Sequence, residues 1–345
     1  MRSSRLSGFG FPKAHAAAFG LLAYQSTWLR HHYPAEFLCA LLNEQPMGFY
    51  PPATLVRDAQ QHGVEVLPVD VNLSEADCTV KVTCGDGHRT SVVRIGVSYV
   101  ASVGKDDAEA LVAEREGNGP FLDVADLARR AALSGDGLEA LVKSGACDGF
   151  GRPRRDLLWE LGLALRPLSV PGTAGEAKQL PLPLEPTVET PTLRGLTRWE
   201  RMLADYRHTG MSVGTHPLAL LRPHLPAGTL SSAELREQRH GRRIAVAGMT
   251  VARQRPSTAN GIVFMLIEDE HGQVNLIVPT AVYDRHRATV RAEPLVLARG
   301  RYERVAENRN VLVSSIEPLG ALARAAAESD SVWESLPRPH SFGRR

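Results

Sequence analysis

Two glycine-containing turns, each followed by a helical pattern, could bind the phosphates of a nucleic acid. The first runs from Val100 to Gly104 and Lys105, and a helix is expected from Asp106 to Arg115. Glycine lets the backbone approach a phosphate closely, and the free N–H groups at a helix start can receive it. The spacing therefore predicts the first half of a helix-hairpin-helix.

A second turn of the same kind lies between helices that are expected to begin near Leu138 and at Asp156. Its glycines are Gly145 and Gly151. The residues that follow it are basic: Arg152, Arg154 and Arg155. Cations at a helix start oppose the helix dipole, so a phosphate backbone would explain their presence. Two helical hairpins with glycine caps and no ligand are the alternative.

Lys13 and His15 lie at the head of an expected amphipathic helix over residues 12–31. Free N–H groups and a cation at a helix start suit an anionic ligand, so these side chains are candidates for holding a nucleotide triphosphate. A solvated lysine beside a histidine that caps the helix is the alternative, and the residue pattern leaves both open.

Five strand-like runs near the end of the chain predict a β-barrel. They cover residues 244–249, 262–267, 274–278, 295–298 and 311–314. A helical stretch at 281–291 separates the third run from the fourth. This order is typical of an OB-type five-stranded barrel.

Barrels that bind single strands combine a basic groove with side chains on which bases stack. The cationic candidates here are Arg253, Arg255, Arg299, Arg301 and Arg304, and the available aromatics are Phe264 and Tyr302. Residues 236–309 contain 13 arginines against 8 acidic residues, a basic excess that suits nucleic acid. A core position for Phe264 is the alternative. Because aromatics are few, binding should depend on charge and weaken with salt.

A glutamine followed by alternating leucines occurs inside the Pro-rich stretch at 166–193. The four positions that would contact a partner are Gln179, Leu180, Leu182 and Leu184. An exposed extended segment of this kind resembles the short peptides that dock into bacterial sliding clamps. A plain Pro-rich spacer is the alternative.

The sequence lacks the usual patterns of catalytic phosphate chemistry. Two-metal phosphoryl transfer needs carboxylates a few ångströms apart, and no D-x-D pair occurs. No P-loop, H-x-H or G-x-S-x-G pattern is present either. The four cysteines have no C-x-x-C spacing, so they are expected to be small buried residues: Cys39, Cys78, Cys84 and Cys147.

Composition indicates a globular chain of two or three domains. Of 345 residues, 43% are hydrophobic and 23% are charged, which is ordinary for a folded protein. No apolar run approaches the roughly 18 residues of a membrane span, and no signal peptide is recognised, so no membrane partner and a cytoplasmic location are expected. Only five of the 40 basic residues are lysine, and arginine suits bidentate phosphate contacts.

Several stretches together resemble one family. They are residues 10–19, 24–37, 40–50, 62–68, 210–217 and 248–259. Over nearly its whole length the chain resembles the C-terminal third of the bacterial error-prone DNA polymerase, the second α-subunit-like polymerase of the C family. The run NEQPMGFY at 43–50 is specific to that branch.

The resemblance implies a multidomain α+β chain in which Lys13 and His15 face the incoming nucleotide. The implied parts are the last portion of the polymerase fingers (1–90), a helix-hairpin-helix region that binds duplex DNA (91–165), a Pro-rich linker (166–193), a helical connector (194–235), an OB-type barrel near single-stranded template (236–318) and a tail (319–345). The family's palm, with its catalytic aspartates, has no counterpart in this sequence.

The expected function is therefore binding of primer-template DNA without sequence preference, by a fragment that is inactive alone. A stand-alone DNA-binding accessory protein and one chain of a split polymerase are the alternatives. For the full-length family the resemblance implies Mg²⁺, damage-induced translesion synthesis, and a sliding clamp and mutagenesis accessory proteins as partners. This chain itself is expected to hold no cofactor and no metal.

Overall fold

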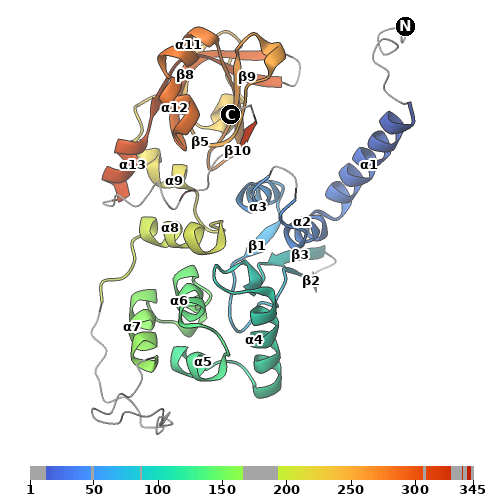
Figure 1. Cartoon of the computed structure of the whole chain (residues 1–345). Helices are drawn as coiled ribbons and strands as arrows, with labels where there is room; N and C mark the ends of the chain where they lie inside the picture. Colours follow the sequence, from blue (N-terminus) through green and yellow to red (C-terminus); the bar gives the residue numbers. More distant parts are fainter. Residues whose placement is uncertain are drawn as a thin grey trace.

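The computed structural model describes residues 13–47, 50–85, 88–165, 193–305, 308–327, 336 and 340–342. Three parts follow one another along the chain: helices with a small sheet, a layer of helices, and a β-barrel (Figure 1). The expected α+β architecture, a helical region followed by a five-stranded barrel, is confirmed. None of the helices in these ranges has the length and apolar character needed to cross a membrane.

The first part packs two helices that begin with proline onto a small sheet. Its helices are α1 (Lys13–His32), α2 (Pro34–Asn43) and α3 (Pro52–Gln61), and its strands, in sheet order, are β1 (Glu65–Leu67), β3 (His88–Arg94) and β2 (Thr79–Gly85). Proline suits a first turn because the N–H it lacks would have no partner inside the helix. Leu38, Val56 and Val93 belong to the shared core.

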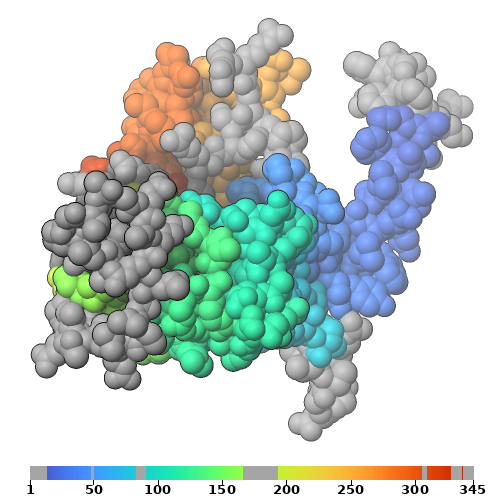
Figure 2. All heavy atoms as spheres, turned by 60° about the horizontal axis from the view of Figure 1, so that its bottom comes forward, coloured from blue at the N-terminus to red at the C-terminus, as the bar shows by residue number. Residues whose placement is uncertain are grey.

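Helix α1 stands clear of the rest of the described chain (Figure 2). Its large apolar side chains are exposed, with Phe19 at 59%, Tyr24 at 68% and Trp28 at 42%. An ion pair of 2.7 Å between Arg30 and Asp58 joins its C-terminal end to α3. Large apolar side chains such as these are normally covered, so α1 presents an uncovered apolar surface.

The second part is a layer of helices with one core. Its elements are η1 (Val97–Tyr99), α4 (Lys105–Asn118), α5 (Val124–Arg130), α6 (Gly135–Ser144), η2 (Asp148–Phe150) and α7 (Arg154–Ala164). Val100, Leu111, Leu127, Leu141 and Leu157 lie within this core and are almost completely buried. Both expected turns therefore connect helices that are packed into one unit.

The third part is a closed, mixed barrel of five strands. In chain order they are β5 (Arg243–Gln254), β6 (Val263–Glu268), β7 (Gln273–Val278), β8 (Leu295–Val305) and β9 (Asn308–Pro318). The β7–β9 pair is parallel and the other four pairs are antiparallel; β5 pairs with both β6 and β8 and so closes the barrel. Two short helices, α11 (Thr280–Arg285) and α12 (Arg287–Ala292), replace the single helix expected between β7 and β8.

Short helices join the helical layer to the barrel. They are α8 (Arg198–Thr209), α9 (Pro217–Leu221) and α10 (Ser232–Leu235). A further helix, α13 (Gly320–Ala327), follows the barrel. Two short strands, β4 (Thr229–Leu230) and β10 (His340–Phe342), pair in parallel with β5. Met202 of α8, Leu218 of α9 and Ala323 of α13 share an apolar cluster with Met249 and Leu297 of the barrel. The connector is thus packed against the barrel wall.

Candidate nucleic-acid interface

The first hairpin turn places Gly104 at the start of α4, where its N–H donates to the carboxylate of Asp107 at 3.2 Å. Lys105 donates to Asp77 at 3.1 Å, and its side chain is 62% exposed. The backbone of Gly104 is extended, with φ −72°, so any residue could adopt it. The helix start therefore already has carboxylates beside it, and a phosphate would have to displace them.

The second turn is closed around an arginine. Gly145 has a left-handed backbone with φ +89°, and a Cβ there would lie 2.1 Å from Nη2 of Arg154. Gly151 also has a positive φ, of 72°, but a Cβ there would meet open space. Gly145 is needed for both its conformation and its lack of a side chain.

Arg154 holds the second turn to the connector. Its Nε and Nη2 donate to Asp148 at 2.9 and 2.8 Å, and its Nη1 donates to the Lys143 carbonyl at 3.0 Å and to Asp205 of α8 at 2.8 Å. The side chain is only 7% exposed. Burial also raises the pKa of the Asp205 carboxyl, which Arg154 partly offsets. The sequence placed Arg154 among the DNA contacts, whereas the structure engages it in the fold.

Every lysine and arginine between residues 97 and 165 is paired with a carboxylate. The pairs not yet named are Arg115–Glu75, Arg129–Asp126, Arg130–Glu114, Lys143–Glu139, Arg152–Glu160 and Arg155–Glu200. Exposed pairs are weak, typically about 0–1 kcal/mol, so a phosphate can compete for Lys105 or Arg152. The helix-start arginines that suggested a ligand have carboxylate partners within the protein.

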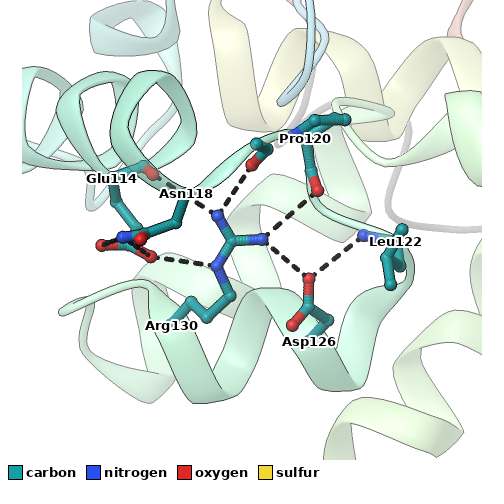
Figure 3. Close-up of a pocket in the computed structure, with 7 residues that line it drawn as sticks. Glu114, Asn118, Pro120, Leu122, Asp126 and Arg130 are labelled. Atoms are coloured by element: carbon teal, nitrogen blue, oxygen red, sulfur yellow. Dashed lines mark hydrogen bonds and ion pairs between the residues drawn. The ribbon is translucent and has the colours of Figure 1, made fainter.

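A shallow pocket between α4 and α5 surrounds Arg130 (Figure 3). The guanidinium donates to Glu114 at 2.9 Å, to Asp126 at 3.0 Å and to the Gly119 carbonyl at 2.7 Å. It also lies over the Phe121 ring at 4.6 Å. All these contacts come from the protein itself, so Arg130 fastens the 117–122 turn. Sequence reasoning missed this role, although Asp126 and Arg130 are four residues apart in a helical pattern.

The Asp126 carboxyl in this pocket should make stability depend on pH. Burial raises its pKa, but hydrogen bonds from the Leu122 N–H and from Arg130 outweigh burial, so the pKa lies below the ordinary 3.8. A lowered folded-state pKa stabilises the fold above the unfolded value, and this stabilisation is lost as pH falls through the folded value. Wild type should therefore lose its advantage over Asp126→Asn as pH falls from about 5 to below the ordinary value of 3.8. Urea unfolding at each pH measures this, and a constant difference would contradict it.

The outer wall of the barrel brings one row of side chains together across its strands. Phe264 of β6 pairs with Ile277 of β7, Ile277 with Leu312 of β9, and Leu312 with Arg301 of β8. Phe264 is 40% exposed, so it is not a core residue. Arg301 is exposed and pairs with Glu303 at 2.8 Å. We call Phe264, Ile277, Leu312 and Arg301 the barrel row.

Two predicted barrel residues do not face outward. Tyr302 is 0% exposed and belongs to the barrel core, so the expectation that it was available for stacking is wrong. Arg253 is 7% exposed and donates to the Glu293 carbonyl. Burial lowers the pKa of Arg253 to about 10. Along a strand, successive side chains alternate between faces, which a short residue pattern does not by itself assign.

The remaining barrel candidates are accessible. Arg255 is exposed at the end of β5 with its guanidinium 4.5 Å from the centre of the Tyr283 ring. Arg299 pairs with Glu317 and is partly exposed. Arg304 is exposed at the end of β8. The structure therefore gathers cations near the barrel row, and a face of this kind can stack bases and attract phosphates.

The candidates outside these two regions are not brought to them. His15 lies in α1, exposed, with its ring 4.4 Å from that of Phe19. Lys13 begins α1, and its side chain is not among those described. The clamp-like positions 179–184 lie outside the described residues. Cys39, Cys78 and Cys147 are buried, as predicted for small core residues.

Comparison with known proteins agrees with this geometry. A family model described as "Helix-hairpin-helix motif" matches residues 63–157, which include both turns. Error-prone DNA polymerases are similar to 91–92% of the chain: 43% identical in Anaeromyxobacter sp. strain K, 41% in Alkalilimnicola ehrlichii and 39% in Pseudomonas aeruginosa. The chain spans only 28–30% of the length of these relatives. That share fits the expected likeness to a C-terminal third.

Proposed function

Since this chain is homologous, over nine-tenths of its length, to a segment of the bacterial error-prone DNA polymerases, we propose that it is the DNA-holding portion of such a polymerase. In this proposal the helical hairpins contact the duplex part of primer-template DNA. The barrel binds the single-stranded part. Contacts to backbone phosphates and base faces carry little sequence information, so binding should be non-specific.

The barrel row is the observation that carries this proposal. Phe264 is a large aromatic side chain, 40% exposed on a strand of the barrel. Ile277 and Leu312 extend the apolar surface beside it, and Arg301 ends it with a positive charge. An apolar surface of this kind suits the faces of unpaired bases, and the arginine suits their phosphates.

We further propose that the chain alone does not extend a primer. Primer extension by two-metal chemistry needs paired carboxylates. The sequence provides no D-x-D pair from which they could come. The translesion and damage-response roles of the relatives belong, in this proposal, to a polymerase of which this chain supplies the DNA contacts.

Salt dependence of DNA binding tests the proposed function. If about five phosphates of a single strand are neutralised, a fourfold rise in salt should weaken binding about 100-fold. Fluorescence anisotropy with labelled oligo(dT) and with a labelled duplex, at about 50 and 200 mM salt, measures both parts of the interface. Absence of binding at low salt would overturn the proposal. Primer extension by the purified chain with Mg²⁺ would overturn its inactivity.

Replacing Phe264 by alanine should weaken single-strand binding selectively. Stacking of a base on an aromatic side chain contributes about 1–3 kcal/mol, which corresponds to roughly 5- to 150-fold in affinity. Duplex binding should change little, because paired bases are not available to stack. Anisotropy with oligo(dT) and duplex measures both, and Leu122→Ala is a control at a side chain that is 79% exposed in the helical layer. Equal losses on both DNAs would exclude stacking.

A second candidate is one chain of a split polymerase. The uncovered apolar surface of α1 favours it, because Phe19, Leu22 and Tyr24 are each more than half exposed. Contiguous exposed apolar surfaces commonly mark interaction sites. Mixing the chain with the separately expressed catalytic portion of a relative and measuring primer extension distinguishes the two candidates. Activity that requires both chains would favour the split enzyme.

A further inference from the structure

Arginines gather around one end of the barrel, where the chain enters β5 and where β8 leads toward β9. We call them the arginine cluster: Arg239, Arg242, Arg243, Arg301, Arg304 and Arg309. The turn before β5 is held against β8, since the Gly241 N–H donates to the Tyr302 carbonyl at 2.8 Å and the Tyr302 N–H donates to the Arg242 carbonyl at 2.9 Å. These backbone bonds bring residues about 60 positions apart to one place.

Two pairs within the arginine cluster are directly opposed across strands. Arg243 of β5 is the antiparallel partner of Arg301, and Arg304 of β8 is the partner of Arg309 in β9. Side chains at directly opposite positions have Cβ atoms about 4.5–5.5 Å apart, and like charges there destabilise a sheet. The fold therefore keeps four arginines in an arrangement that costs stability.

Carboxylates do little to neutralise this end of the barrel. Arg301 pairs with Glu303, and Arg242 donates to the neutral amide of Gln238. Within the portion of the chain that the structure describes, Arg239, Arg243, Arg304 and Arg309 form no ion pair. The helical layer differs, because there every basic side chain has a carboxylate partner. Positive charge that is uncompensated and mutually repelling creates a positive potential that favours an anionic ligand.

We propose that the arginine cluster binds the backbone phosphates of a single DNA strand whose bases lie on the barrel row. This rests on the proposed function and assigns the charged half of the site. The row and the cluster share Arg301, and the pairing continues from Phe264 through Ile277 and Leu312 to Arg301 and Arg243. Four strand spacings give about 19 Å around the barrel, enough for several nucleotides.

This arrangement places base contacts and phosphate contacts at opposite ends of the row. Phe264 marks the end where bases stack, and Arg243 marks the end where the backbone is held. A small anion would need only one or two of the arginines. An acidic protein would have no use for the exposed aromatic at the other end of the same row. A strand with alternating bases and phosphates uses both ends.

Neutralising one member of each opposed pair tests the proposal. In the double variant Arg243→Gln/Arg304→Gln, the slope of log affinity for oligo(dT) against log salt should fall by about 1.4, or about 0.7 per lost phosphate contact. The same variant should unfold at a higher temperature than wild type, because both like-charge pairs are removed. Higher stability with weaker binding is not expected from residues that merely support the fold.

The matched control is Arg287→Gln/Arg291→Gln on α12, which makes the same change in net charge on exposed arginines of the same barrel. Its salt slope should stay at the wild-type value. A second probe is oligo(dT) with uncharged methylphosphonate linkages, on which wild type and the cluster variant should bind equally. This probe isolates the phosphate contribution from stacking.

The outcomes separate the two proposals. If wild type binds no oligo(dT) even at low salt, the proposed function fails. If wild type binds but the cluster variant keeps its salt slope, the arginine cluster is not the phosphate site and only this inference fails. An equal decrease of the salt slope in the control variant Arg287→Gln/Arg291→Gln would also overturn this inference, because net charge and not position would then govern binding. A cluster variant that binds normally and loses an acidic protein partner would assign the cluster to that partner.

Discussion

Replacing Arg154 by alanine is expected to lower the free energy of unfolding by about 3–5 kcal/mol, the usual cost of removing one partner of a buried ion pair. The variant would leave Asp205 of α8 and Asp148 of η2 without their cation. The Lys143 carbonyl would lose its donor as well. Urea unfolding measures the loss. Hydrogen exchange should locate it in α6, α7 and α8.

The control for this variant is Arg152→Ala, two residues earlier. Arg152 pairs with Glu160, but its side chain is 44% exposed, so its removal should cost at most about 1 kcal/mol. At temperatures where both variants are folded, Arg152→Ala should lose more DNA affinity than Arg154→Ala, because Arg152 is open to a phosphate and Arg154 is not. Equal losses of stability in the two variants would show that Arg154 does not hold the turn to the connector.

The second large effect is expected at Gly96, which precedes the first hairpin. A Cβ there would lie 2.4 Å from the Asp77 carbonyl carbon and 2.5 Å from the Ala76 carbonyl oxygen. Both are backbone atoms, so no side-chain rotation can relieve the contact. Gly96→Ala should therefore destabilise the fold by about 3 kcal/mol, at the upper end of overpacking costs. Thermal and urea unfolding measure it.

Gly162→Ala is the matched control for Gly96→Ala. Gly162 lies inside α7, and a Cβ there would meet nothing within 4 Å. Alanine is favoured over glycine inside a helix by roughly 0.5–1 kcal/mol, so this variant should be slightly more stable than wild type. If Gly96→Ala behaves like the control, the backbone around residues 76–78 must move freely. The first hairpin would then not be fixed against the small sheet.

Most of the secondary structure could be predicted because its signals are local. Prolines at the starts of α2 and α3, helical spacing in α1, and five apolar runs separated by turns each act within a few residues. The β2–β3 hairpin was missed, although the sequence Asp-Gly at 86–87 is a local signal that is typical of hairpins.

The candidate interface was predicted less well, because exposure and charge pairing are not local properties. Phe264 and Tyr302 are both strand aromatics, yet one is 40% exposed and the other fully buried. Arg253 lies near the end of β5 and is buried, whereas Arg255, one residue past the end of the strand, is exposed. Of the four unpaired arginines of the arginine cluster, only Arg304 was among the sequence candidates, because the opposition of these side chains across strands depends on register.

The sequence by itself determined most of the helices and strands in their order, the two glycine turns and the likeness to error-prone DNA polymerases. It also showed that all but five of the 40 basic residues are arginines and that no D-x-D pair occurs. Only the tertiary structure decided which arginines remain available for a ligand. Arg154 bonds to Asp205, which is 51 residues away in sequence, and Arg243 lies directly opposite Arg301 on the neighbouring strand. The physical reason is that Coulomb interactions depend on distance in space and on burial, which packing sets after the local elements have formed.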